Sequence, residues 1–173
     1  MIVWPRTIRR SRLRLVLCLL LMTGILQEGA AAPASPDEVI GSGDLKYIAI
    51  FTGQCRFQMP EGSFPCNPKV VLISLRNGRS LLAFSSGEIV FHLSGGQDRQ
   101  PNLENYYLSI DSLGMDSPDI NAVDRGLEGE CHFRLNKDAT KFFSIKCDVY
   151  NRAQGARYSF VLDKIARTHR RSF

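Results

Sequence analysis

Apolar and polar residues alternate over several short stretches between residues 70 and 162, and no stretch sustains a helical period. A period of two is typical of strands that bury one face. The stretches 106–113, 127–135 and 142–150 show this alternation, and the short, largely apolar stretches 70–75, 81–84, 89–93 and 158–162 also predict strands. Short strands with frequent turn residues favour an antiparallel all-β fold. We therefore expect about eight strands, arranged as an antiparallel β-sandwich or as an up-and-down β-barrel.

The first three of these strands are predicted to form a meander. Asn77-Gly78 is a strong hairpin signal, and Ser86-Gly87 marks a second tight turn. Pairing about these turns sets Ile73 opposite Leu82, and Leu82 opposite Phe91, on one apolar face. The opposite face is also apolar, so we expect a second sheet, barrel closure or a partner to cover it. The candidate interaction surface on this face consists of Val70, Leu72, Leu81, Ala83 and Val90.

The cysteines fit the same strand pattern. Cys55, Cys66, Cys131 and Cys147 follow the N-terminal segment, and four cysteines allow three pairings. A hairpin register that pairs Phe133 with Ile145 also brings Cys131 to Cys147. A turn at Pro60-Glu61 brings Cys55 to Cys66 in the same way. We expect two hairpin disulfides. The spacings fit no usual zinc motif, so no metal or other cofactor is predicted.

The N-terminal segment has the pattern of an export signal. Basic residues are followed by the uncharged stretch 15–26 and by the small residues 29–34. We expect residues 1–34 to be a signal peptide, cleaved after Ala31 or Ala34, and the mature protein to be periplasmic or secreted without spanning the membrane. Beyond it we expect a flexible lead-in (35–46), a single β domain (47–163) and a basic C-terminal tail (164–173).

Charge argues against a nucleic-acid-binding domain. The chain has 22 basic and 17 acidic residues. Residues 1–34 contribute five arginines and one glutamate, and the last ten residues contribute four basic side chains. The positive charge therefore lies at the two ends of the chain rather than on one face of a domain.

Candidate chemistry is sparse. His92 and His132 lie on predicted strands and point away from their apolar neighbours, so we expect solvated positions. His169 falls in the basic tail, where we expect disorder. The aspartates between Asp111 and Asp124 suggest an ordinary acidic loop, with a calcium site as the alternative.

We predict no catalytic residue and expect a non-enzymatic domain that binds a protein or an envelope component. One alternative is a small-molecule carrier with an apolar barrel cavity. The other is a cell-envelope hydrolase, which would set His92 or His132 beside a carboxylate in a cleft.

A series of short motifs carries a resemblance. They are Gly53-x-Cys55, Pro65-Cys66, Asn77-Gly78-Arg79, Tyr107-x-Ser109-Ile110-Asp111, Gly129-x-Cys131 and Ile145-x-Cys147. Their order resembles an uncharacterised family of small exported proteins of Gram-negative bacteria. The resemblance implies export and two disulfides, and it brings no activity and no site residue.

Overall fold

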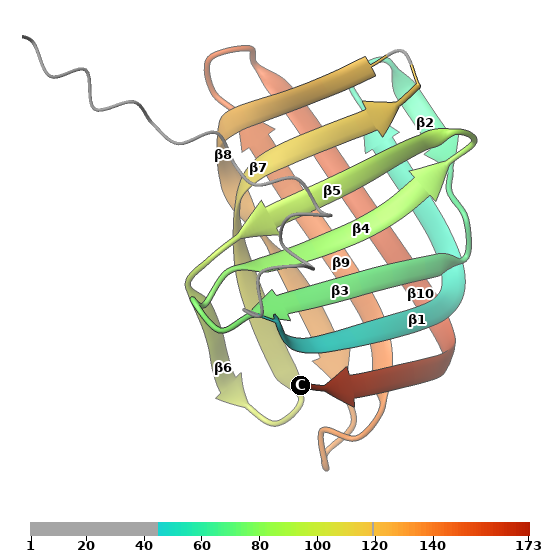
Figure 1. The fold of residues 1–173 in the computed structure, drawn as a ribbon, viewed down its shortest axis with the longest axis vertical. Coiled ribbons are helices and arrows are strands. Elements are labelled where there is room, and N and C mark those ends of the chain that lie inside the picture. The colour runs from blue at the N-terminus through green and yellow to red at the C-terminus, as the bar shows by residue number, and fades with distance from the viewer. Residues whose placement is uncertain (1–44, 119) are drawn as a thin grey trace, which may run out of the picture. The chain divides into compact units, whose positions relative to one another are not determined.

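The structure, a computed structural model, describes residues 45–118 and 120–173, and it is built from antiparallel strands (Figure 1). The strands are β1 (Leu45–Met59), β2 (Gly62–Pro65), β3 (Lys69–Leu75), β4 (Ser80–Ser86), β5 (Ile89–Gly95), β6 (Asp98–Asn102), β7 (Asn105–Ser117), β8 (Ile120–Leu135), β9 (Phe142–Asn151) and β10 (Ala156–Ser172). The predicted signal peptide and residues 35–44 lie outside the described residues. In the described ranges there is no helix long and apolar enough to cross a membrane.

The strands close into an up-and-down barrel. Eight of them follow one another around it in the order β1-β3-β4-β5-β7-β8-β9-β10, and β10 pairs with β1 to complete the ring. The other two are extensions: β2 forms a short hairpin with β1, and β6 continues the line of β5 along β7. The all-β prediction is confirmed, and of the two predicted architectures the structure is the barrel.

Apolar side chains from every strand of the ring form a core inside the barrel. Aromatic rings gather at the end that holds the β4–β5 and β9–β10 turns. There Phe84 lies 4.4 Å from Phe160 and 4.9 Å from Phe57, measured between ring centroids, and Phe91 lies 4.8 Å from Phe57. We call Phe57, Phe84, Phe91 and Phe160 the aromatic cluster. At most 3% of each of these residues is exposed, so this end is closed by packing.

The predicted β3–β4 register is wrong by one residue. Leu72 pairs with Leu82, because the connection is a three-residue loop in which the N–H of Leu75 donates to the carbonyl oxygen of Arg79. Gly78 has a φ of 86°, as expected when a left-handed residue ends a three-residue hairpin loop. A one-residue shift moves every side chain of a strand to its other face.

The prediction that the candidate interaction surface lies on one face of the sheet is therefore wrong. Val70 and Leu72 point into the core and are at most 1% exposed. Leu81, Ala83 and Val90 lie on the outer face, where Val90 is 41% exposed. The β4–β5 turn is also displaced, with Ser86 opposite Ile89, but that shift of two residues leaves the faces as predicted.

Both predicted disulfides are present. Cys55 bonds to Cys66 across the β1–β2 hairpin, and Cys131 bonds to Cys147 between β8 and β9. Phe133 pairs with Ile145 as the sequence predicted. Two disulfides are consistent with an oxidising, extracytoplasmic location.

The expected tail is part of the barrel. Residues 164–172 form the second half of β10 and pair with β1, from Arg167 opposite Thr52 to Ser172 opposite Tyr47. A bulge at Lys164, whose φ is 48°, shifts the register before this pairing resumes. Leu45 and Lys46, assigned to the lead-in, are in β1, and the expected acidic loop belongs mainly to β7 and β8.

Candidate functional site

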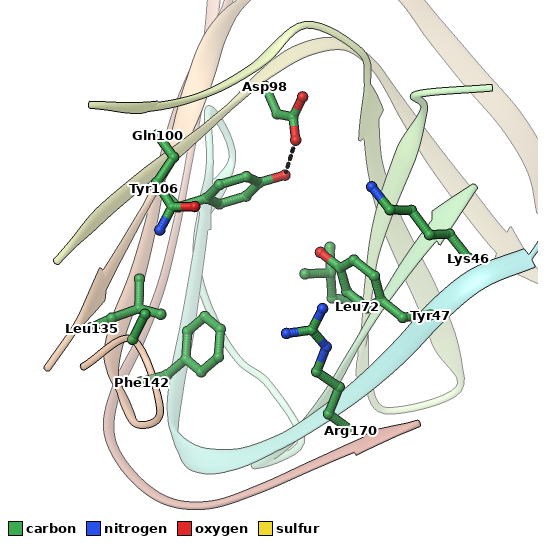
Figure 2. A pocket seen from close by; sticks show the side chains of 10 residues that line it. Lys46, Tyr47, Leu72, Asp98, Gln100, Tyr106, Leu135, Phe142 and Arg170 are labelled. Carbon is green, nitrogen blue, oxygen red and sulfur yellow. Dashed lines mark hydrogen bonds between the residues drawn. The ribbon is translucent and has the colours of Figure 1, made fainter. Parts of the chain in front are cut away.

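A cavity of about 230 Å³ lies at the end of the barrel opposite the aromatic cluster (Figure 2). It is formed where β1 begins and β10 ends, beside β6 and the β8–β9 loop. We call it the barrel-end pocket. Its lining residues are Lys46, Tyr47, Leu72, Asp98, Gln100, Tyr106, Leu135, Ala139, Phe142 and Arg170.

Near the pocket, one ring of inward positions carries small side chains beside Tyr47. Tyr47 pairs with Ser74, Ser74 with Ser80, and Ser80 with Gly95. The buried hydroxyl of Ser80 donates to the hydroxyl oxygen of Ser74 over 3.3 Å. A Cβ at Gly95 would lie 1.8 Å from the carbonyl oxygen of Ser109, so no side chain fits there.

One wall of the pocket is cationic. Arg170 points inward from β10, with its guanidinium carbon 4.5 Å from the centroid of the Tyr47 ring, and Lys46 lies beside them (Figure 2). Neither cation forms an ion pair with another described residue. Burial raises the pKa of Tyr47, and the nearby charge of Arg170 partly opposes this. Two positive charges therefore face the pocket beside a neutral phenol.

The facing wall carries a phenol and a carboxylate. The hydroxyl of Tyr106 donates to Oδ2 of Asp98 over 3.1 Å, as the dashed line in Figure 2 shows. Burial is the largest cause of a strongly raised pKa for Tyr106, and the neighbouring Tyr47 and Asp98 raise it further. Tyr106 therefore remains a neutral donor, and Asp98 keeps acceptor capacity for a second donor.

Apolar side chains complete the lining. Leu72 is 1% exposed and Leu135 is 7% exposed. The Phe142 ring meets Phe51 edge to face at 4.9 Å, and the Tyr106 ring meets Phe133 in the same way at 5.1 Å. These contacts fix the positions of both rings, so the apolar part of the pocket is already formed.

The predicted candidate histidines lie elsewhere. His92 is on the outer face, with its ring against Gly114, and its Nδ1 is 3.8 Å from Oδ2 of Asp116. Burial lowers the pKa of His92, against the opposing effect of Asp116. His92 is thus largely covered rather than solvated, and its neighbouring carboxylate does not belong to the pocket.

His132 and His169 are also outside the pocket lining. Nε2 of His132 is 2.7 Å from Oδ1 of Asn105, and its ring stacks on Tyr107 at 4.4 Å. His169 lies in β10 opposite Ile50, not in a disordered tail. Across the described parts of the chain, no group of three or more His, Cys, Asp and Glu side chains is arranged to hold a metal ion.

Sequence reasoning missed the barrel-end pocket because it assigned two key residues to flexible ends. Lys46 was placed in the lead-in and Arg170 in the tail. A usable signal was present: residues 47–51 (Tyr-Ile-Ala-Ile-Phe) form a short apolar run rich in β-branched and aromatic residues, which is typical of a strand. A strand there would have extended the domain and given β10 a partner.

Comparisons of the chain with protein-family models, with curated proteins and with solved structures found no match. The resemblance to small exported proteins stays a prediction. The inferences below therefore rest on the geometry of the barrel.

Proposed function

We propose that this protein is a periplasmic or secreted barrel that binds a small molecule in the barrel-end pocket. The observation that carries the proposal is the change in interior lining along the barrel. Aromatic rings fill one end, whereas the other end is hollow and exposes charged and hydrogen-bonding groups. Ligand sites are typically preformed apolar hollows with a few convergent polar groups, and mouths of β-barrels are a common location.

The size of the pocket limits the ligand. At about 230 Å³ the pocket lies below the roughly 300–1,000 Å³ of sites for drug-sized molecules. Its lining combines apolar and charged groups. The proposal therefore keeps the carrier hypothesis but replaces its apolar cavity with a small, mixed one.

A fragment screen by thermal unfolding tests this function. Small anionic, neutral and cationic fragments would be compared on the wild-type protein and on Gln100→Trp, which places a large ring at the exposed rim of the pocket. We expect some fragments to raise the unfolding temperature of the wild type but not of Gln100→Trp, because a ligand of the native state stabilises it by mass action.

The matched control is Arg99→Trp. Arg99 lies on the same strand but points outward, with its guanidinium carbon 3.8 Å from the Tyr107 ring centroid and a 2.9 Å ion pair to Glu130. This variant should respond to fragments as the wild type does. Equal responses in all three proteins, or no response in any, would refute binding in the pocket.

A partner-binding role is a second proposal. The outer face has a shallow depression whose lining includes Val71, Ala83 and Val90, the last two from the original candidate surface. Affinity capture from envelope extracts would compare the wild type with a folded Ala83→Asp variant. Recovery of the same proteins by both would exclude this face.

A further inference from the structure

We propose that the ligand of the barrel-end pocket is a small aromatic monocarboxylate with a hydrogen-bond donor at the end remote from its carboxylate. This inference rests on the proposed small-molecule function and specifies the ligand class.

The cationic wall selects the carboxylate. The guanidinium of Arg170 lies against Tyr47, and neither Arg170 nor Lys46 is neutralised by a carboxylate among the described residues. A planar guanidinium binds a carboxylate through two parallel hydrogen bonds, and the Lys46 ammonium in the same pocket adds a point charge. An anionic group therefore fits this wall best.

The opposite wall limits the ligand to a single negative charge. Asp98 lies across the pocket from Arg170, with Tyr106 donating to its Oδ2 (Figure 2). A second anion at that end would meet this carboxylate and be repelled. A hydroxyl group there instead finds an acceptor, because an ionised carboxylate accepts several hydrogen bonds. The ligand is thus asymmetric, with its anion at one end and its donor at the other.

The surface between the two walls favours a ring. Leu72, Leu135 and Phe142 provide an apolar surface, and Phe142 is held by its contact with Phe51. An aromatic body gains both burial and edge-to-face contact there. A free inorganic anion would leave this surface uncovered.

Isothermal titration with four probes of one shape tests the inference. The probes are 4-hydroxybenzoate, benzoate, 4-hydroxybenzamide and benzene-1,4-dicarboxylate. We expect 4-hydroxybenzoate to bind most tightly and benzoate about fivefold more weakly, since it lacks one neutral donor. 4-Hydroxybenzamide should bind at least about tenfold more weakly because it lacks the charge-assisted contact. The dicarboxylate should bind weakest of the four.

Variants of the two walls test which end of the ligand each wall binds. Arg170→Gln should weaken 4-hydroxybenzoate by about tenfold or more, whereas Arg167→Gln, an identical change on the outer side of β10, should leave the affinity unchanged. Asp98→Asn should raise the affinity for benzene-1,4-dicarboxylate, because it removes the repelling charge. Far-UV circular dichroism and thermal unfolding would show that each variant keeps the fold.

The outcomes separate this inference from the proposed function. Fragments that bind the wild type but not Gln100→Trp, combined with equal affinity for benzoate and 4-hydroxybenzamide, would overturn the ligand class and leave the binding function intact. Equal losses in Arg170→Gln and Arg167→Gln would likewise overturn the ligand class. Failure of every fragment to bind would refute both.

Discussion

The two ends of the barrel are built from the same strands and differ in what those strands turn inward. At the packed end, β1 and β10 place Phe57 opposite Phe160, and β4 and β5 place Phe84 opposite Phe91. At the pocket end, Tyr47 and three small residues, Ser74, Ser80 and Gly95, occupy the corresponding ring of positions. The packed end therefore stabilises the fold by apolar burial. The pocket end buries less apolar surface and instead holds a hollow lined partly by charged groups.

The comparison shows how a small barrel combines a closely packed end with an open pocket. Interiors gain stability from close packing, and an unfilled region forgoes that gain. Here the hollow and its charged lining lie at one end, and the aromatic cluster lies at the other. Substitutions at the two ends should consequently change different properties.

The largest effect is expected at the packed end. Phe160 is 0% exposed and contacts Phe84 with ring centroids 4.4 Å apart, so Phe160→Ala removes burial and leaves a cavity. We expect a loss of about 3–5 kcal/mol in the free energy of unfolding, measured by guanidinium chloride denaturation. The matched change at the other end, Arg170→Gln, should cost less than about 1 kcal/mol, because its main contact is one partly exposed cation–π pair. Similar losses of unfolding free energy for the two variants would contradict the claim that the packed end carries more of the stability than the pocket end.

Each disulfide should contribute somewhat less to the free energy of unfolding than Phe160 does. Cys131 and Cys147 are inward residues of β8 and β9, and Cys147 pairs with Phe160. We expect Cys131→Ala/Cys147→Ala to lose about 3 kcal/mol by the same denaturation measurement, because the bond closes a loop with a sequence separation of 16. Cys55→Ala/Cys66→Ala, which opens a loop of separation 11, should lose slightly less. A negligible loss for both pairs would contradict this account of the bonds.

The smallest effect concerns the pocket end at high pH. The folded state raises the pKa of Tyr106, so above the ordinary tyrosine pKa of about 10 the unfolded chain releases this proton before the folded one does. Stability from this group is fully present below pH 10 and falls as pH rises further. Tyr106→Phe should therefore lose less stability than the wild type between pH 9 and 11, measured by urea denaturation at each pH.

Tyr158 provides the matched control at high pH. Burial raises its pKa as well, but it lies outside the pocket lining and bonds to Asp124 over 3.3 Å. Tyr158→Phe should also reduce the loss of stability at alkaline pH, but by less than Tyr106→Phe, because the pKa of Tyr106 is the more strongly raised of the two. An unchanged slope in Tyr106→Phe would show that its phenol is not desolvated.

Much of the fold follows from local pattern. Short apolar or alternating stretches between residues 70 and 162 predict most strands, and the pairing of Phe133 with Ile145 predicts the disulfide from Cys131 to Cys147. The β3–β4 register did not follow, because Asn77-Gly78 is compatible with both a two-residue and a three-residue loop. That single shift carried Val70 and Leu72 from the expected surface into the core.

The pocket was beyond local reasoning for a different reason. Tyr47, Tyr106 and Arg170 lie on strands far apart in the chain, and only barrel closure by β1 and β10 brings them together. Arg170 occupies an inward position of the last strand. Without the pairing of β1 with β10, a basic segment such as this one is predicted to be a solvated tail. Local rules are expected to fail where a site departs from the best-packed solution, as the proposed binding site does.

The most direct test of the central claim is an amide chemical-shift titration of the isotope-labelled protein with 4-hydroxybenzoate. The account predicts saturable shifts at the pocket end, at Tyr47, Tyr106 and Arg170, with the signals of Phe57, Phe91 and Phe160 unmoved. Saturable shifts centred on the packed end or on the outer face, with the pocket signals unchanged, would contradict it.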